Sequence, residues 1–574
     1  MTTIETILEK GTIANAVPIG QSDTNPIRSR TADDHIRKCQ GLYVFADIKR
    51  AVTDPSLHRT VSLYAERFPS TLVIVITKID QGANTSLLEK MQEEEEDMTE
   101  YDRLSGELSR LKIEMKKASK KASMPGRKSA EDRVRLYDRI QDIGKELTDT
   151  ENNQFGKLVR ARNRHTTKGL MQDKQRYFEP GGVLRVVHIS PEHYEVHTSS
   201  ARRRCPLMDV TLTGIPELRD IALMMAGPPL WKAQTEYLES QVSVFIHGLR
   251  LWSAGCAVQD RSQLLSIVAE LFGNEADSPL EGLTAHRDTI IERKLLRALR
   301  TSRKEAHEAA LVQLNGLDKW KARSYVSFYR HFGQHTTESK GTISWNEMFL
   351  QSQTHDKLDP CWHEMVPALQ ETFCEAMKHV SASIEKTKKK LMVSPASISL
   401  DKTVIEGLFK GVSNGLQSDY DRVIENCKQS TLGIKMDATK DRNNSFFTIA
   451  MKPAYEVGQN DKGEGVTRRC KQHLRKHLSL PLHDPREPFA VHHGALAQAL
   501  KDDSRKHTND LQTCVRTRSS EIYRQFELIT EQKPETPAEA SARKAVKPFL
   551  VRALRDIGRI EAVLEQIRSK YPSC

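Results

Sequence analysis

The chain has 574 residues, a formal net charge of +11 and an isoelectric point near 9.0. This length suffices for roughly two to four domains, each with its own core, and excludes a peptide or a small disulfide-stapled module. The positive charge allows contact with nucleic acid or another polyanion, but acidic residues are abundant too, so charge alone identifies no partner.

The cysteines and the apolar segments indicate the cellular compartment. Nine cysteines occur without a C-x-x-C pair, which favours a reducing compartment over a secreted disulfide framework. No apolar run approaches the roughly 20 residues that span a bilayer, and the first residues, MTTIETILEKG, lack the basic start and apolar stretch of a signal peptide. We therefore expect an intracellular protein, nuclear or cytoplasmic, with no transmembrane segment.

The first predicted elements form a β-α-β unit. Residues 41–46 (GLYVFA) and 72–76 (LVIVI) have the pattern of short buried strands, and residues 56–68 that of a helix between them. A third apolar run, residues 183–189 (VLRVVHI), gives a weaker strand signal. Short apolar strands joined by a helix predict a parallel α/β sheet with covered faces, and ligands of such sheets bind at the carboxyl ends of the strands.

The second strand runs into the tetrapeptide TKID, residues 77–80, which is the main candidate binding motif. The carboxylate of Asp80 can accept two parallel hydrogen bonds, from N1–H and the exocyclic amine of guanine, whereas adenine offers no such donor pair. The stem of Lys78 can lie along the purine plane, and Thr77 can support the loop. Ser190 follows the third strand and can back the loop from its other side. The alternative is a strand that ends in an ordinary charged turn.

Residues 85–178 form a long polar segment before the third strand, where a plain nucleotide-binding domain needs only one helix. Two apolar stripes with helical spacing flank the sequence MPG at residues 124–126 and predict an antiparallel helical hairpin. The stripes consist of Leu104, Leu108, Leu111, Met115, Leu136, Ile140, Ile143 and Leu147. Because the seam is narrow and the outer faces are charged, we expect the hairpin to project and to contact a partner or a second copy of the chain.

Two basic clusters accompany the predicted hairpin. They consist of Lys116, Lys117, Lys120, Lys121, Arg127 and Lys128 near its tip, and of Lys157, Arg160, Arg162, Arg164 and Lys168 beyond it. Either cluster can contact phosphates or act in nuclear import, and either can be a solvated helix face balanced by the acidic residues 93–97. No aromatic residues are interleaved, so stacking on single-stranded nucleic acid is not indicated.

Residues 214–218 (GIPEL) begin a helix that closes the first domain, and we place the domain boundary at residue 228. Residues 229–574 are rich in helix formers, which predicts a large all-helical, stalk-like bundle. We expect breaks near residues 332–344, 394–400, 452–466 and 480–488, where Gly, Pro, Ser and Asn occur.

Three further features of this helical region lead to predictions. An aromatic-rich stripe at positions 231, 238, 242, 245, 249 and 252 is expected to face the core. The last helix, around residues 550–567, is expected to pack on the bundle or to pair with another chain. His473 and His477 have i, i+4 spacing but lack the carboxylate of an H-E-x-x-H site, so we predict no metal ligand.

Several segments of the chain together resemble a known family. They are residues 22–39 (SDTNPIRSRTADDHIRKC), 46–54 (ADIKRAVTD), 73–80 (VIVITKID), 213–219 (TGIPELR), 333–347 (GQHTTESKGTISWNE) and 462–474 (KGEGVTRRCKQHL). In order and spacing they are similar to the fungal relatives of the nuclear GTPase SLIP-GC, which are large dynamin-like GTPases, over nearly the whole chain. The resemblance implies a P-loop GTPase-like α/β domain that binds GTP and Mg²⁺, a helical insert after the guanine motif and a long helical stalk.

The phosphate-binding motifs of this family do not occur in the sequence. The chain contains no G-x-x-x-x-G-K-[ST], and residues 16–20 read AVPIG where the family's Asp-x-Pro-Gly switch motif is expected. Phosphate and Mg²⁺ contacts supply most of the affinity and nearly all of the catalysis in such sites, so we expect weak GTP binding, no catalytic residue and no hydrolysis by the family mechanism. An N-terminally truncated GTPase and a degenerate GTPase would both fit. The alternative function is that of a non-enzymatic helical scaffold or interaction protein derived from a GTPase, whose hairpin and helical bundle bind a partner. Self-association through the hairpin or the stalk is a further expectation.

Overall fold

The computed structural model describes residues 35–36, 39–82, 85–94, 96–123, 129–178, 182–198, 206–253, 261–271, 280–337, 341–397, 400–442, 445–459, 461–530 and 536–570. The chain divides into two compact units, Met1–Gly227 (unit 1) and Pro228–Cys574 (unit 2). The boundary expected from the sequence, at residue 228, coincides closely with this division.

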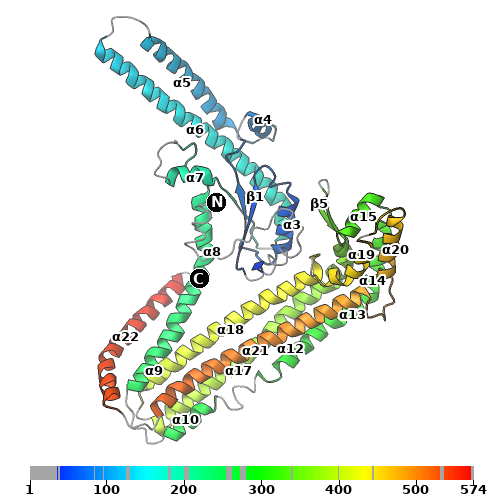
Figure 1. Cartoon of the computed structure of the whole chain (residues 1–574). Coiled ribbons are helices and arrows are strands. Elements are labelled where there is room, and N and C mark those ends of the chain that lie inside the picture. The colour runs from blue at the N-terminus through cyan, green and yellow to red at the C-terminus, as the bar shows by residue number, and fades with distance from the viewer. Residues whose placement is uncertain are drawn as a thin grey trace. The chain divides into compact units, whose positions relative to one another are not determined.

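Unit 1 contains a small parallel sheet, and its other described elements are helices (Figure 1). Its elements are β1 (Leu42–Asp47), α3 (Pro55–Tyr64), β2 (Leu72–Thr77), α4 (Thr85–Glu93), α5 (Thr99–Ser123), α6 (Ala130–Lys174), a 3₁₀ turn (Gln175–Tyr177), β3 (Arg185–His188), α7 (Pro191–Thr198) and α8 (Ile215–Glu236), which continues into unit 2.

The three strands of unit 1 lie in the order β1-β2-β3, and both pairs are parallel, as predicted. The run Leu72–Ile76 of β2 is fully buried, as suits a central strand that is covered on both faces. The register pairs Asp47 with Thr77 and Ile76 with His188, so all three strands end at one edge. This edge carries the candidate site.

Two helices illustrate how local sequence sets the frame of the sheet. α3 begins at Asp54, whose carboxylate accepts hydrogen bonds from the amides of Ser56 and Leu57 as an N-cap. α8 places Ile215, Leu218 and Ile221 in one core cluster with the buried valines of β2. Both helices thereby fix the sheet from which the binding loops emerge.

α5 and α6 form an antiparallel hairpin in the segment for which one was expected, and Figure 1 shows it extending away from the sheet of unit 1. Its seam contains buried Leu111, Ala118 and Ile143, with Met115 beside them. The side chain of Gln154 donates to Ser105 Oγ at 2.5 Å, which fixes the register of the two helices. The basic residues Arg127 and Lys128 and the turn residues 124–126 lie outside the described residues.

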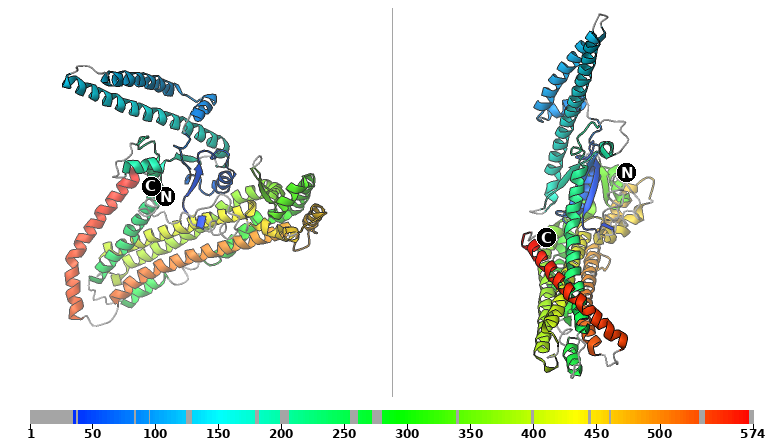
Figure 2. Two further views of the ribbon diagram at one scale, coloured as in Figure 1. Left: turned by 45° about the horizontal axis from the view of Figure 1, so that its top comes forward. Right: turned by 90° about the vertical axis from the view of Figure 1, so that its left-hand side faces the viewer.

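The described residues of unit 2 are mainly helical and include one small strand pair (Figure 1, Figure 2). Its elements are α9 (Ser243–Ser253), α10 (Arg261–Ala269), α12 (Leu283–Ile291), α13 (Arg297–Thr301), α14 (Arg303–Leu317), α15 (Ala322–Arg330), β4 (Gln334–Thr337), β5 (Gly341–Ser344), α16 (Trp345–Gln353), α17 (Asp359–Val393), α18 (Lys402–Thr439), α19 (Phe446–Gln459), α20 (Val466–Leu478), α21 (Pro488–Thr530) and α22 (Pro537–Lys570).

The long helices α17, α18 and α21 lie side by side in unit 2 (Figure 1, Figure 2). Phe373, Phe409 and Phe526 are part of the core that they share. A second cluster surrounds Trp345 of α16, which stacks on Phe328 of α15 with ring centroids 5.2 Å apart. A third cluster includes Trp362, Leu369 and Leu496, so the helical region expected from the sequence has several hydrophobic cores.

The strand pair corrects one prediction for unit 2. β4 and β5 pair antiparallel within residues 332–344, which were expected to form a loop. The β-branched residues Thr336, Thr337, Thr342 and Ile343 favour a strand over a coil there. The break expected at residues 452–466 also begins later, because α19 continues through Pro453 to Gln459.

The aromatic-rich stripe of residues 231–252 was predicted to be core, and this prediction is wrong. Phe245 is 60% exposed, and the buried face of α9 is instead formed by Val244, Ile246 and Leu251. A π-helical turn, Tyr237–Val242, precedes α9. Such a turn inserts extra residues per turn and rotates the following face, so the 3.6-residue pattern does not continue across it.

The C-terminal helix α22 packs on unit 2, which was one of its two expected arrangements. It lies against α9, with Leu550 and Leu564 buried. Glu561 pairs with Lys410 at 3.0 Å, and Arg568 pairs with Glu239 at 2.7 Å.

Candidate guanine-recognition site

The predicted site residues lie around the carboxyl edge of the sheet in unit 1. Thr77 is the last residue of β2, and Asp80 lies three residues beyond it. The amide of Ile189 donates to the carbonyl of Ile76 at 2.7 Å, which extends the pairing of β3 and β2 up to the residue before Ser190. Open parallel sheets bind ligands at this edge.

Asp80 and Ser190 are in direct contact, although 110 residues separate them in sequence. The Ser190 hydroxyl donates a 2.8 Å hydrogen bond to Asp80 Oδ1. Ser190 itself is fully buried, and its amide donates to the Thr213 carbonyl at 2.9 Å. The carboxylate is thereby fixed by a rigid partner, as expected for a group that must present its remaining lone pairs in one direction.

Thr77 and Lys78 connect the loop to the neighbouring strand β1. The Thr77 hydroxyl donates to the Ala46 carbonyl at 3.2 Å, which ties the end of β2 to β1. Lys78 adopts a left-handed backbone conformation with φ of +60°, and its ammonium donates to Asp47 Oδ2 at 2.9 Å. The half-exposed lysine side chain therefore reaches from the loop after β2 to the end of β1.

Asp47 is a site residue that the sequence did not reveal. It is the last residue of β1, and its Oδ1 accepts the Lys49 amide at 2.9 Å. Burial raises the pKa of the Asp47 carboxyl, but the Lys49 amide and the Lys78 ammonium outweigh this effect and hold the pKa below its usual value. Asp47 is thus an ionised anchor for Lys78. Asp47 belongs to the family-like segment 46–54 (ADIKRAVTD), but no role of its own was predicted from the sequence.

Arg162 corrects the sequence-based view of the second basic cluster. It was expected either to contact phosphates or to lie on a solvated helix face, but it is only 8% exposed. Its Nη1 donates a 2.6 Å hydrogen bond to the Gln81 carbonyl, in the loop that carries Asp80. Burial lowers the pKa of the Arg162 guanidinium, while the charges of Asp47 and Asp80 raise it.

Gly214 of the TGIPELR segment packs against the end of β3. Its φ is +68°, and a Cβ at this position would lie 1.8 Å from the carbonyl oxygen of His188. Only glycine allows this approach of backbone to the end of β3. The glycine therefore allows the backbone geometry in which the Thr213 carbonyl accepts the Ser190 amide.

The other family-like segments do not join this site in the described residues. Residues 22–34, with the SDTN sequence, and residues 16–20 lie outside the part that the structure describes. The segments 333–347 and 462–474 belong to unit 2. There His477 Nε2 donates a 2.9 Å hydrogen bond to the Ala450 carbonyl, which is a structural contact.

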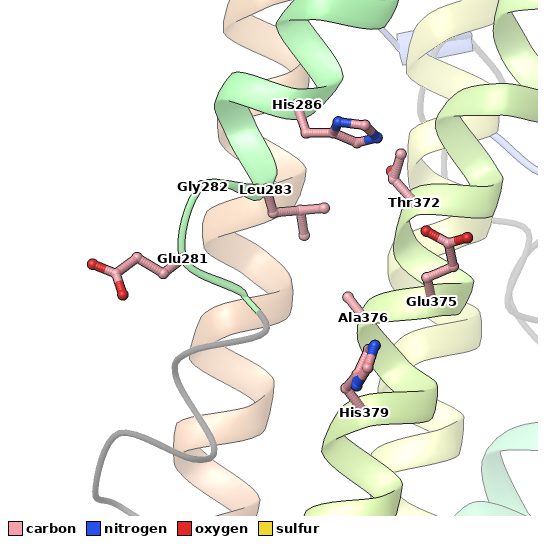
Figure 3. A pocket seen from close by; sticks show the side chains of 8 residues that line it. All are labelled: Glu281, Gly282, Leu283, His286, Thr372, Glu375, Ala376 and His379. Atoms are coloured by element: carbon pink, nitrogen blue, oxygen red, sulfur yellow. The ribbon is translucent and has the colours of Figure 1, made fainter.

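Unit 2 contains a cavity of about 430 Å³ between α12 and α17 (Figure 3). Figure 3 shows the His286 ring and the Glu375 carboxylate turned toward this space, whereas Glu281 points away from it. Within the described residues, metal-ligating atoms gather within 4.8 Å of one another only at Cys427, Asp503 and His507. That group is buried beside the Arg287 guanidinium, whose Nη2 lies 3.5 Å from Cys427 Sγ, and a cation there disfavours a metal ion.

Comparison with known proteins gives one match. Residues 301–481 match the model of a family described as a domain of unknown function (DUF7605). The match lies within unit 2 and includes the buried residues of the Trp345 cluster except Phe489, but it does not reach the candidate site in unit 1. No curated protein and no solved structure matches the chain. None of the described helices combines the length and the apolar composition needed to cross a membrane.

Proposed function

We propose that unit 1 recognises the guanine base of a nucleotide, as the base-reading part of a dynamin-like GTPase-family protein. The observation that carries this proposal is the contact between Asp80 and the buried Ser190 at the carboxyl edge of a parallel sheet. The hydrogen bond uses one lone pair of Oδ1. Oδ2 and the second lone pair of Oδ1 are then available for the two parallel donors of guanine.

Lys78 supports the same role. Its ammonium is held by Asp47, so its methylene stem is fixed next to the Asp80 loop and offers an apolar surface on which a purine can stack. Lys78 would then stack on one face of the base, and Asp80 would accept the hydrogen bonds from its edge. This division of tasks matches the two requirements of base recognition, stacking and edge hydrogen bonding.

The proposed activity is base recognition, and we assign no hydrolysis step to the described residues. The sequence contains no G-x-x-x-x-G-K-[ST], so the phosphate contacts that dominate the affinity of GTPases have no motif to supply them. We accordingly expect affinities in a weak range, about 0.1–1 mM, in which the choice of base is nevertheless measurable.

The proposal is tested by changing the hydrogen-bonding pattern of Asp80 without changing its shape. In Asp80→Asn, an amide N–H₂ replaces one acceptor, so the loop should reject guanine and accept xanthine, which has a carbonyl in place of the exocyclic amine. We expect the wild type to prefer GTP over ATP by about tenfold or more, and Asp80→Asn to prefer XTP over GTP. Equal binding of GTP and ATP by the wild type, measured by calorimetric titration, would refute the proposal.

A further inference from the structure

The inserted helix α6 contacts three segments at the carboxyl edge of the sheet in unit 1. A Cβ at Gly169 would lie 3.2 Å from the Val52 side chain, beyond β1, and one at Gly156 would lie 3.3 Å from Leu212, next to the partner of Ser190. Between them, Arg162 donates to Gln81, beyond β2. One continuous helix therefore braces the segments that follow β1 and β2 and the segment whose Thr213 carbonyl accepts the Ser190 amide.

The Asp80 loop depends on such bracing because its backbone is in an uncommon conformation. Lys78 and Gly82 both have positive φ, +60° and +74°, and the turn between them is closed by the Gln81 amide, which donates to the Lys78 carbonyl at 3.1 Å. A non-glycine residue with positive φ is strained and persists only when its surroundings hold it. Arg162 holds the carbonyl of the same residue, Gln81, from outside the loop.

The charge of Arg162 adds a second effect. Its guanidinium is buried within the electrostatic range of both Asp47 and Asp80, yet its described hydrogen bond goes to the neutral Gln81 carbonyl. The cation thus balances two carboxylates that stand at adjacent strand ends, without occupying the acceptors that a base would use. A neutral side chain of equal size would keep the packing and lose this balance.

We propose that Arg162 is a positioning residue for base recognition, and that the docking of the α6 shaft on the sheet regulates the affinity for guanine. This inference rests on the proposed function of Asp80. α6 continues without interruption from Arg162 to the hairpin at Ala130, where α5 packs against it. A force or a partner acting on the hairpin would therefore be transmitted along a helix to the loop that reads the base.

The test compares Arg162→Met with Arg164→Met in the full chain. Arg164 lies on the same helix but is exposed, and among the described residues it forms an ion pair with Glu96 at 3.5 Å, so it is a matched control for the loss of one arginine. Two readouts are needed. The first is hydrogen exchange at the amides of residues 79–82 in the ligand-free protein, and the second is the ratio of guanosine to adenosine binding.

We expect Arg162→Met to raise exchange at residues 79–82 by about tenfold and to lower the guanine preference by about three- to tenfold, as for the loss of one charge-assisted hydrogen bond. Arg164→Met should leave both readouts unchanged, and Arg162→Lys should restore part of each. Arg162→Met and Arg162→Lys exchanging at residues 79–82 as the wild type does would overturn the proposal.

The two readouts separate this inference from the proposed function. If the wild type shows no guanine preference, the assignment of Asp80 fails, and the exchange at residues 79–82 alone decides whether Arg162 positions the loop. If the wild type prefers guanine but Arg162→Met retains that preference, base recognition stands and the regulatory role of α6 is refuted.

Discussion

Gly214 shows how strongly one residue can constrain the candidate site. Replacement by alanine would place a methyl group against the His188 carbonyl and would impose a left-handed conformation on a residue with a side chain. We expect Gly214→Ala to destabilise unit 1 by about 2–4 kcal/mol. Gly106→Ala is the control, because Gly106 lies in helix α5 with open space around it, and alanine should be neutral or stabilising there by up to about 1 kcal/mol. Thermal unfolding of the two variants checks the difference, and equal midpoints would contradict the backbone assignment.

The buried side chain of His188, which lies next to Gly214, predicts that the stability of unit 1 depends on pH. Burial lowers the pKa of His188 to about 4, and its Nε2 has no hydrogen-bond partner in the described residues. The folded state therefore keeps the ring neutral, while the unfolded chain protonates it below about 6.5. The free energy of unfolding therefore has its full value above about pH 6.5. It decreases as the pH falls toward 4, by about 2 kcal/mol between pH 7.5 and 5.

The variant His188→Gln isolates this effect from that of His492 in unit 2, whose pKa is also lowered to about 4 by burial. Native-state hydrogen exchange of peptides from β2, corrected for intrinsic rates, measures unit 1 separately. The wild type should lose more protection than His188→Gln on going from pH 7.5 to 5. The same loss in both proteins would show that His188 does not titrate as its burial implies.

At the scale of elements, the hairpin depends on a narrow seam. Leu111 of α5 is 3% exposed and packs against Ile143 of α6, whereas Ile113, two residues further on, is 54% exposed. Leu111→Ala should destabilise the hairpin by about 2 kcal/mol, and Ile113→Ala by less than about 0.5 kcal/mol. Hydrogen exchange should accelerate in peptides of residues 104–118 and 140–147 in the first variant only. An equal response to both substitutions would contradict the seam.

The accuracy of the sequence-based predictions also differs among elements for physical reasons. The strands of the sheet were predictable because continuous apolar runs of this length suit a buried parallel strand, and the hairpin because its stripes repeat with helical spacing. The core face of α9 was not predictable, because a π-helical turn shifts the helical pattern without a local sequence signal. Asp47 and Arg162 could not be placed in the site either, because their roles arise only from tertiary contacts with Lys78 and Gln81.

At the scale of the molecule, the candidate site and the matched family lie in different units. The site belongs to unit 1, and the DUF7605 match of residues 301–481 to unit 2. Unit 2 is built around buried polar groups as well as apolar ones: Arg287 donates to the Leu369 carbonyl at 2.7 Å and lies 3.9 Å from the Phe373 ring centroid. The family match therefore concerns unit 2 alone, and the base-reading function proposed for unit 1 rests on the geometry of its own residues.

The most direct test of guanine recognition compares three nucleosides, which differ only at the edge that Asp80 would read. Guanosine offers both donors, inosine offers N1–H alone, and adenosine offers neither in the required place. Ligand-observed NMR at millimolar concentrations should give binding in the order guanosine, inosine, adenosine, with about three- to tenfold between successive ligands, and this order should vanish in Asp80→Ala. Equal binding of the three nucleosides by the wild type, or the same order in Asp80→Ala, would contradict guanine recognition by Asp80.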